Sequence, residues 1–379
     1  MIPYGRQTID EDDIQAVIEV LRSDYLTTGP KVAEFEQVVA SYVRANYGVA
    51  VANGTAALHC AMYALNIGPG DEVIVPPITF AATANAVCFM GGTPVFADVD
   101  KKTLLIDPDA VREKISPKTR AIIGVDYAGL PCDWDQLRSI ADEHGLYLVA
   151  DGCHALGGEY KGRKVGTLAD ITVFSFHPVK HIATGEGGMV VTDNAGFAEK
   201  VRLFRSHGIT TDARQREATG AWFYEMVDLG FNYRITDIQC ALGVSQMGKL
   251  EAWLLKRRKI AAIYDAFFEK TSIAKPLFNK SDSNHAYHLY VVEVQESAGH
   301  SRNTLFDMLR QKGIGVNVHY VPVHLHPYYR KRFGYGEGLC PVAEHMAGRI
   351  LSIPMFAGLS DVDLQTVLST FQSLEDGLL

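Results

Sequence analysis

Short apolar segments alternate with longer segments of helical periodicity over the first 250 residues. The apolar segments are too short for independent helices and predict buried strands. They cover residues 47–52, 71–76, 93–99, 121–126, 146–150, 171–176 and 189–192. The intervening segments carry apolar residues at helical spacing and predict helices. They cover residues 14–21, 32–43, 56–65, 134–144 and 197–204, together with a helix that ends at residue 90. Alternating strands and helices are typical of an α/β fold with a mostly parallel sheet.

The pattern changes towards the C-terminus. Residues 209–226 are polar and weakly patterned, which predicts a mobile loop, and one long helical pattern follows at 235–269. Beyond it we expect strands at 285–294 and 315–320 and helices at 303–312 and 361–374. This part predicts a smaller α+β domain. We therefore expect a large domain, residues 1–250, and a small domain, residues 251–379.

Composition and charge exclude several classes of protein. The 379 residues are 47% hydrophobic and carry a formal net charge of -8, which predicts a large core and no basic surface for nucleic acid. No apolar stretch is long enough to span a bilayer, and the first residues lack the apolar segment of a secretory signal. The six cysteines are scattered without CxxC spacing, as reduced thiols are. We expect a cytoplasmic protein with no nucleic-acid or membrane partner.

Asp151 and Lys180 follow two of the predicted strands. In open α/β sheets ligands bind outside the carboxyl ends of strands, so both side chains fall where chemistry is expected. One interpretation is an ion pair at the sheet edge. The other is a pyridoxal phosphate site, in which lysine holds the cofactor as a Schiff base and aspartate keeps the pyridine nitrogen protonated. The glycine-rich turn at 185–188 and the neighbouring Ser175 and His177 favour the second.

Asn53, Gly54 and Thr55 connect a predicted strand to a predicted helix. The free N–H groups and the dipole of a helix N-terminus favour an anion such as phosphate, although a simple N-cap explains the same residues. Phe80 opens the next helix, and a lone phenylalanine in that position is usually a core residue.

A metal site is not predicted. His324 and His326 form an HxH pair that can chelate, and His319 lies close by in the sequence. No cysteine or carboxylate has ligand-like spacing near them, and prolines make this segment a rigid loop.

Three separated segments together carry a resemblance to a known family. They are Asp151-Gly-Cys-His154, Ser175-Phe-His-Pro-Val-Lys180 and Gly185-Glu-Gly-Gly188. In this order they resemble the DegT/DnrJ/EryC1/StrS sugar aminotransferases, and the likeness extends from Pro3-Tyr4-Gly5-Arg6 to the last helix. The resemblance implies the pyridoxal-phosphate-dependent transferase fold of type I (aspartate aminotransferase-like). That fold has a large domain with a mostly parallel seven-stranded sheet and a small α+β C-terminal domain.

The resemblance also implies roles for individual residues. Lys180 and Asp151 would be catalytic. His154 would support Asp151 or flank the cofactor ring, and Phe80 would stack on that ring. The other implied cofactor ligands are the phosphate-binding residues Gly54, Thr55, Ser175 and Asn232. Asn232 would reach the cofactor of the opposite subunit, which implies a homodimer with shared active sites. The implied substrate contacts are Tyr4, Thr28, His319 and Tyr320.

The reaction implied is transfer of an amino group from L-glutamate to the keto carbon of a UDP-linked sugar. Within the family the chain is most similar to members that act in pseudaminic acid biosynthesis. These aminate C4 of UDP-2-acetamido-2,6-dideoxy-β-L-arabino-hex-4-ulose, a 4-keto-6-deoxy-N-acetylhexosamine. The alternatives are the aminotransferase for UDP-4-amino-4-deoxy-L-arabinose or another nucleotide-keto-sugar aminotransferase. Relatives with histidine in place of the lysine are dehydratases, so Lys180 favours amination. A non-catalytic, pyridoxal-binding regulator of the same fold is disfavoured, because Lys180, Asp151 and Asn232 are all present.

Overall fold

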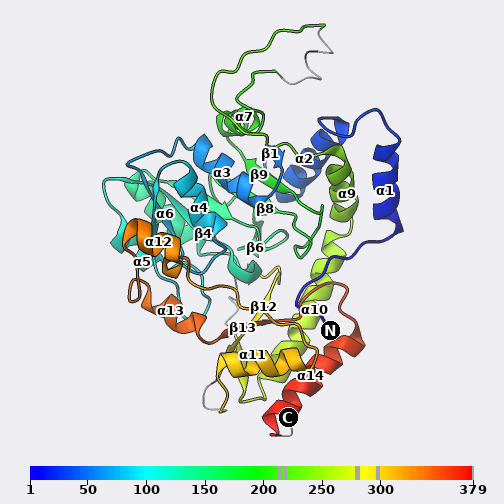
Figure 1. Ribbon diagram of the computed structural model, residues 1–379, viewed down its shortest axis with the longest axis vertical. Helices are drawn as coiled ribbons and strands as arrows, with labels where there is room; N and C mark the ends of the chain where they lie inside the picture. Colours follow the sequence, from blue (N-terminus) through cyan, green and yellow to red (C-terminus); the bar gives the residue numbers. More distant parts are fainter. Residues whose placement is uncertain (212–215, 217–219, 278–281, 296–298, 378–379) are drawn as a thin grey trace.

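A seven-stranded sheet forms the centre of the N-terminal region (Figure 1). The computed structural model describes residues 1–211, 216, 220–277, 282–295 and 299–377. In spatial order the strands are β1 (Tyr47–Val51), β9 (Gly188–Thr192), β8 (Ile171–Ser175), β5 (Tyr147–Asp151), β4 (Thr119–Val125), β2 (Glu72–Val75) and β3 (Thr93–Phe96). Only β9 is antiparallel to its neighbours β8 and β1. The mostly parallel sheet is therefore confirmed, and each apolar segment predicted as a strand in this region belongs to it.

Helices cover both faces of this sheet. They are α2 (Pro30–Val43), α3 (Gly54–Ala64), α4 (Ala82–Phe89), α5 (Pro108–Lys114), α6 (Trp134–His144) and α7 (Ala195–Phe204). Helix α1 (Glu11–Leu21) packs against α9 (Asp237–Met247) instead. The connections from β1 to β2 through α3 and from β2 to β3 through α4 run along the sheet towards β3. The connections from β3 to β4 through α5 and from β4 to β5 through α6 run back towards β1. Right-handed crossovers therefore place α3 and α4 on one face and α5 and α6 on the opposite face. The contacts of α3 with α4, and of α5 with α6, agree with this arrangement.

The long helical pattern at 235–269 forms two helices, so the prediction of one helix is wrong. Helix α9 (Asp237–Met247) begins at a capping box between Thr236 and Gln239, and α10 (Leu250–Phe268) begins after Gly248 and Lys249. Lys249 forms ion pairs with Asp10 and Asp13 of the first helix region. The apolar periodicity continues across the break, so it could not reveal where the chain changes direction.

A second core surrounds a small antiparallel sheet. Its strands are β10 (Ala274–Pro276), β12 (Tyr290–Val294) and β13 (Ile350–Ile353), and its helices are α10, α11 (Arg302–Gln311) and α14 (Asp361–Glu375). The strand predicted at 315–320 is wrong, because Asn317 makes an isolated bridge to Ser352 and no ladder follows. The strand predicted at 285–294 begins only at Tyr290. Residues 285–289 and the segment that follows Asn317 turn towards the large sheet instead.

The C-terminal region is joined to the large sheet at several places. The segments η3 (Val323–Leu325), α12 (Pro327–Phe333) and α13 (Pro341–Ala347) pack on the first core. Strand β11 (Ser283–Asn284) pairs with β6 (Glu159–Tyr160), which pairs with β7 (Arg163–Lys164). The short 3-10 turn η1 (Tyr127–Gly129) follows β4. The division into two domains at residue 250 stays a prediction, because segments that follow this residue also pack on the large sheet and its helices.

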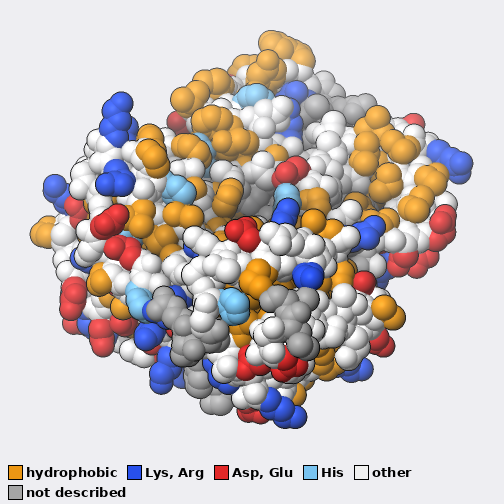
Figure 2. All heavy atoms as spheres, turned by 60° about the horizontal axis from the view of Figure 1, so that its bottom comes forward, with side chains coloured by type: hydrophobic (Ala, Val, Ile, Leu, Met, Phe, Trp, Pro, Cys, Tyr) orange, Lys and Arg blue, Asp and Glu red, His pale blue; other side chains and the backbone are white. Residues whose placement is uncertain are grey.

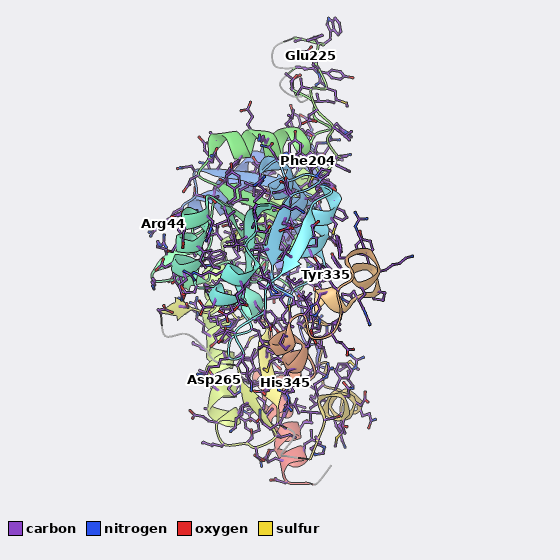
Figure 3. The ribbon with its side chains drawn as sticks, turned by 90° about the vertical axis from the view of Figure 1, so that its left-hand side faces the viewer. Arg44, Phe204, Glu225, Asp265, Tyr335 and His345 are labelled. Atoms are coloured by element: carbon purple, nitrogen blue, oxygen red, sulfur yellow. The ribbon has the colours of Figure 1, made fainter. Side chains whose placement is uncertain are left out.

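Residues 220–232, which precede α9, extend away from the sheet (Figure 1). Figure 3 shows Glu225 of this arm well beyond Phe204, at the end of the molecule opposite Asp265 and His345. We call residues 220–232 the arm. Large hydrophobic side chains of the arm are exposed: Trp222, Phe223, Tyr224, Met226, Val227, Leu229 and Phe231. The loop predicted at 209–226 includes residues 212–215 and 217–219, which lie outside the described residues; the rest contains an isolated bridge between Ile209 and Met226.

On the face shown in Figure 2, Lys and Arg side chains are scattered among acidic and hydrophobic ones. In the described part of the chain, no helix combines the length and apolar character needed to cross a bilayer. All six cysteines are free thiols, and Cys60, Cys132, Cys240 and Cys340 are buried.

Candidate active site

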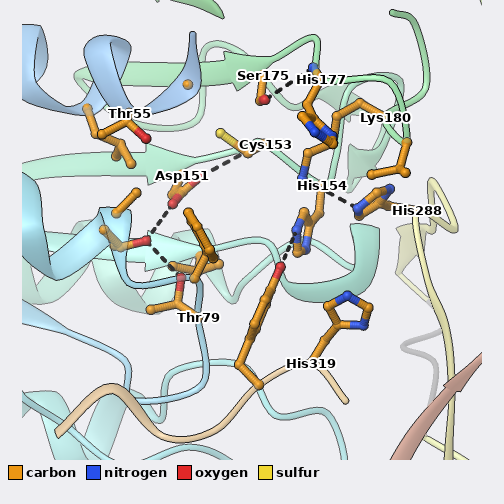
Figure 4. A pocket seen from close by; sticks show the side chains of 18 of the residues that line it. Thr55, Thr79, Asp151, Cys153, His154, Ser175, His177, Lys180, His288 and His319 are labelled. Carbon is orange, nitrogen blue, oxygen red and sulfur yellow. Dashed lines mark hydrogen bonds between the residues drawn. The ribbon is translucent and has the colours of Figure 1, made fainter. Parts of the chain in front are cut away.

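A cavity of about 550 Å³ lies at the edge where the parallel strands end (Figure 4). Strands β1, β2, β4, β5 and β8 contribute side chains just at or beyond their carboxyl ends, as expected for an open α/β sheet. The contributions are Asn53, Gly54 and Thr55 after β1, Thr79 and Phe80 after β2, Val125 of β4, Asp151 of β5 and Ser175 of β8. Lys180 and His154 complete the floor, and Tyr4, His319 and Tyr320 form another wall.

Asp151 is buried, and its carboxylate is held from two sides. Oδ2 accepts a 2.7 Å hydrogen bond from the hydroxyl of Thr83, and Oδ1 accepts a 3.3 Å hydrogen bond from the backbone N–H of Cys153. His154 makes no hydrogen bond to Asp151 among those in the structure, so the support predicted from His154 comes from Thr83 instead. The carboxylate is thereby fixed in direction at the tip of β5.

Lys180 lies across the cavity from the ends of β1 and β2 (Figure 4). Burial lowers the pKa of its amine, and the neighbouring Cys153 and Asp151 oppose that change. Its Nζ lies 3.4 Å from Nε2 of His288. A lysine whose pKa is lowered by burial has a larger share of its amine neutral, as a nucleophile or a general base requires.

The turn between β1 and α3 makes a cradle of backbone groups. Asn53 is the N-cap of α3, since its Oδ1 accepts a 2.8 Å hydrogen bond from the N–H of Ala56. A Cβ at Gly54 would come within 2.9 Å of Cβ of Ser175 and 3.3 Å of Sγ of Cys153. Only glycine therefore allows the helix N-terminus to approach Ser175 so closely. The N-cap is therefore confirmed, and the anion site at the same turn stays a prediction.

His154 is held in one tautomer by its two partners. Its Nδ1 accepts a 3.3 Å hydrogen bond from the N–H of Ala128, and Nε2 lies 3.1 Å from the hydroxyl of Tyr320. Burial, with Lys180 nearby, moves the pKa of His154 well below its ordinary value, so the ring is neutral. Because Nδ1 accepts, Nε2 carries the hydrogen and donates to Tyr320. The hydroxyl hydrogen of Tyr320 is then free to point into the cavity.

The wall opposite the sheet edge is formed by 317–320. The ring of Tyr4 lies 5.3 Å from that of His319, and Nδ1 of His319 bonds the hydroxyl of Ser352 at 2.8 Å. Burial lowers the pKa of His319 to about 4. The hydroxyl of Tyr127 donates to the carbonyl oxygen of His319. These contacts fix the wall, and with it the position of Tyr320.

Phe80 is not the core residue that its position alone suggests. Its side chain is 61% exposed and lines the cavity, with its ring 6.2 Å from that of Tyr320. An aromatic face at the mouth of the cavity suits stacking on a flat ligand.

Two predicted site residues do not reach this cavity within one chain. Thr28 lies beside the bridge between Thr27 and Thr236, at the start of α2, and Asn232 is exposed at the base of the arm, where it bridges Ser206. Neither lines the cavity.

Several cavity residues were missed at the level of sequence. Thr83 had a signal, since it is a polar residue in the segment that follows a predicted strand, four positions after Thr79. His288 had none, because its segment resembled a regular strand. Asn317 and Glu186 also line the cavity, as does His177, which the sequence placed beside Ser175.

His324, in the histidine-rich segment, is paired with a carboxylate. Nε2 of His324 lies 2.9 Å from a carboxylate oxygen of Glu344. Among the residues that the structure describes, no group of three or more His, Cys, Asp or Glu side chains is placed to hold a metal ion.

The residues fit pyridoxal phosphate. The cavity brings together the buried carboxylate of Asp151, the amine of Lys180 with its lowered pKa, and the exposed ring of Phe80. It also includes the N-terminus of α3, which Gly54 allows to lie close to Ser175. These are the groups needed for the pyridine nitrogen, the aldehyde carbon, the ring face and the phosphate.

Comparison with known proteins gives the same class. A profile of the DegT/DnrJ/EryC1/StrS aminotransferase family matches residues 7–372. The spore coat polysaccharide biosynthesis protein SpsC of Bacillus subtilis is 41% identical over 379 residues, which cover 99% of this chain and 97% of SpsC.

Two solved structures superpose on the whole chain. The putative sugar aminotransferase Spr1654 of Streptococcus pneumoniae, in its PMP-form, has a TM-score of 0.94 and 32% identity, with full coverage of both chains. Helicobacter pylori PseC, an aminotransferase involved in the biosynthesis of pseudoaminic acid, has a TM-score of 0.92 and 32% identity, with 99% of each chain covered. Spr1654 is also known in a PLP-form.

Fold and comparisons define a pyridoxal-phosphate-dependent sugar aminotransferase of fold type I. The chain belongs to the DegT/DnrJ/EryC1/StrS aminotransferase family.

Proposed function

We propose that this enzyme transfers an amino group from L-glutamate to C4 of a UDP-linked 4-keto-6-deoxy-N-acetylhexosamine, as in pseudaminic acid biosynthesis. The observation that carries the proposal is the opposition of Lys180 and Asp151 in one cavity at the strand ends. The full-length likeness to PseC supports the class of sugar, and glutamate is the donor that the family resemblance implies.

The proposed roles follow from the positions of the groups. When bound, pyridoxal phosphate supplies an electron sink that lets a proton leave the carbon next to the transferred nitrogen. Asp151 accepts a hydrogen bond from the pyridine N–H, and Thr83 holds that carboxylate in direction. The free amine of Lys180 takes the proton from one carbon and returns it to another, for which its lowered pKa suits it.

The remaining ligands bind and orient. The backbone N–H groups at Gly54 and Thr55 and the hydroxyl of Ser175 hold the phosphate. Phe80 and His154 line the cavity and would flank the ring of the cofactor. Tyr4, His319 and Tyr320 contact the sugar, and the hydroxyl of Tyr320 is the polar group best prepared to donate a hydrogen bond to it.

A homodimer with shared sites is part of the proposal. The arm exposes a continuous group of large apolar side chains, which a second copy of the chain would cover. Asn232 lies at the base of the arm and outside its own cavity, as a residue that serves the partner's cofactor would. Thr28 is proposed to act at the same interface, where the substrate of the partner enters.

A different nucleotide-linked keto sugar is a second candidate. It is favoured by the 41% identity to SpsC, whose name refers to spore coat polysaccharide rather than to pseudaminic acid. The alternatives include the 4-keto precursor of UDP-4-amino-4-deoxy-L-arabinose.

The visible absorption spectrum of the purified enzyme tests the function. L-Glutamate should bleach the band of the bound cofactor, and the correct UDP-keto sugar should restore it. Recovery with the L-arabino-hexulose and not with the arabinose precursor would support the pseudaminic acid substrate, and the reverse would replace it. A Lys180→Ala protein with normal turnover would remove the central role given to Lys180.

A further inference from the structure

His288 is buried beside Lys180 but has no role in the scheme above. It stands at the end of residues 285–288, which leave the C-terminal region and turn back towards the large sheet. Its Nε2 lies 3.4 Å from Nζ of Lys180, and Figure 4 shows the two side chains on the same side of the cavity. Its Nδ1 is buried without a hydrogen-bond partner among the described residues. Buried polar atoms in native proteins are rarely left in this state, so this one calls for an explanation.

The segment that carries His288 is held from several sides. Ala286 donates a 2.9 Å hydrogen bond to the carbonyl of Gly129, and Leu289 donates a 3.2 Å hydrogen bond to that of Ala128. A Cβ at Gly129 would come within 3.1 Å of the backbone N of His288, so the turn and this segment are in close contact. Arg257 donates to the carbonyl oxygens of Tyr287 and His288. The imidazole is therefore aimed at Lys180 by a rigid support.

The charge state of the imidazole is set by its surroundings. Burial lowers the pKa of His288 well below its ordinary value, and the nearby Lys180, His154, His181 and Arg257 add to that change. A neutral ring has one nitrogen that donates and one that accepts. An ammonium group offers only donors, so Nε2 must accept from Lys180 and Nδ1 must carry the hydrogen. The tautomer that Lys180 requires thus places the N–H on Nδ1, the atom that has no partner among the described residues.

We propose that His288 is a positioning residue that receives the amine of Lys180 whenever that amine is not bonded to the cofactor. The inference rests on the proposed function, in which Lys180 is released once in each half-reaction and must then move protons. A free lysine side chain populates many rotamers, and a hydrogen bond to an acceptor in a fixed position restricts it to a few of them. His288 would hold the amine in the cavity between the two transfers.

Other groups also face Lys180 and must be accounted for. They are Asp151 and Cys153 from β5 and the turn after it, His154 from the same turn, His181 from the adjoining position and His319 from the opposite wall. Asp151 is the carboxylate among them, and it is turned towards Thr83 and the backbone of Cys153. In the described part of the chain, the hydrogen bond of Nζ is to His288 and to none of these other groups.

The test compares three replacements of His288 in the full-length protein. His288→Phe keeps the volume and loses the acceptor. His288→Gln presents an oxygen near the place of Nε2, whereas His288→Asn presents one near the place of Nδ1. His324→Gln, which replaces a buried histidine bonded to Glu344, is the matched control.

The first readout uses cofactor-free protein. The pKa of the Lys180 amine is measured from the way its acetylation in the folded protein depends on pH. The acetylation is followed in the peptide that contains Lys180. Loss of the acceptor destabilises the ammonium form, so His288→Phe and His288→Asn should lower that pKa by about one unit. His288→Gln and His324→Gln should leave it near the wild-type value.

The second readout is the bleaching of loaded enzyme by glutamate, with hydrogen or deuterium at its α-carbon. His288→Phe should slow bleaching about tenfold and raise the isotope effect, because proton transfer by a poorly placed amine becomes limiting. The defect should persist at pH values above the pKa of Lys180. His288→Gln should recover most of the rate.

A folded His288→Phe protein with an unchanged lysine pKa and isotope effect would overturn the proposal. Identical behaviour of His288→Gln and His288→Asn would do the same, and these polar variants serve if the phenylalanine variant does not fold. If wild-type enzyme is not bleached by glutamate, the proposed function fails, while the lysine pKa in cofactor-free protein still decides on His288.

Discussion

The hydroxyl of Thr83 donates a 2.7 Å hydrogen bond to Oδ2 of Asp151 and so joins the second residue of α4 to the tip of β5. The hydroxyl of Thr79 lies 2.7 Å from that of Thr83. Because the hydrogen of Thr83 is committed to the carboxylate, Thr79 must be the donor to Thr83. The two threonines form a directed chain that ends on the residue proposed to bind the pyridine nitrogen.

Thr83→Val should weaken binding of pyridoxal phosphate. Valine has nearly the same shape but no donor, so it leaves Oδ2 of Asp151 and the hydroxyl of Thr79 unpaired at a cost of about 1–3 kcal/mol. We expect a roughly tenfold loss of affinity, measured by titration of cofactor-free protein with absorbance detection. Thr83→Ser keeps the donor and should bind almost as wild type. Equal losses in both variants would show that the hydrogen bond is not what holds Asp151.

Gly54→Ala should weaken the same binding through the phosphate. The new methyl group would lie 2.9 Å from Cβ of Ser175, so the N-terminus of α3 and Ser175 must move apart. Overpacking of this kind costs about 1–3 kcal/mol, and affinity for inorganic phosphate and for the cofactor should fall together. Gly68→Ala is the control, because a Cβ there meets nothing within 4 Å. Normal phosphate affinity in Gly54→Ala would remove this turn from the site.

Asp126 should make the enzyme less stable as the pH rises. Its Oδ1 accepts from the N–H of Cys132 and from Nε1 of Trp134, while Oδ2 has no partner among the described residues. Burial raises its pKa from 3.8 to about 8, with Asp151 adding to that rise. Between these values the native state binds a proton that the unfolded state has released, so stability falls with rising pH.

Asp126→Asn removes that proton requirement and keeps an acceptor for Cys132. The stability gained over wild type should grow by about 1.4 kcal/mol per pH unit from about pH 4 and level off near pH 8. Chemical denaturation at a series of pH values measures it. Asp109→Asn, on an exposed carboxylate, should change stability by less than about 0.5 kcal/mol at every pH. A pH-independent effect of Asp126→Asn would mean that Asp126 is ionised in the native state.

Mixed dimers should reveal whether sites are shared. Lys180→Ala and Asn232→Ala are each expected to be impaired, but a dimer with one of each has one site free of both changes. Random reassortment should restore about a quarter of wild-type activity. A mixture of Lys180→Ala and Asp151→Ala should restore none, because both residues line the cavity of one chain. Failure of the first mixture to recover activity, although the dimers exchange, would place Asn232 outside the partner's site.

The sequence predicted the parts of the site that follow from the strand pattern. Asp151 and Ser175 end buried strands, and Gly54 follows one, so their common edge could be anticipated. His288 could not be found in this way. Its segment has the composition of a strand, yet its backbone bonds the turn at Ala128 and Gly129, and only tertiary contacts decide that. The break at Gly248 was hidden for a similar reason, since both helices keep an apolar side.

The pairing of β11 with β6 bears on how ligands enter. Ala286 and Leu289 also bond the turn after β4, and Tyr329 of α12 bonds Asn85 of α4, so the chain after residue 250 is joined to the large sheet and its helices at several places. Enzymes that close around a ligand by hinge motion need a free boundary between their lobes. Here the wall that carries Tyr320 and the floor that carries Lys180 form one preorganised body. Recognition should therefore require little ordering of the chain, and the overall dimensions in solution should stay the same when the sugar nucleotide arrives.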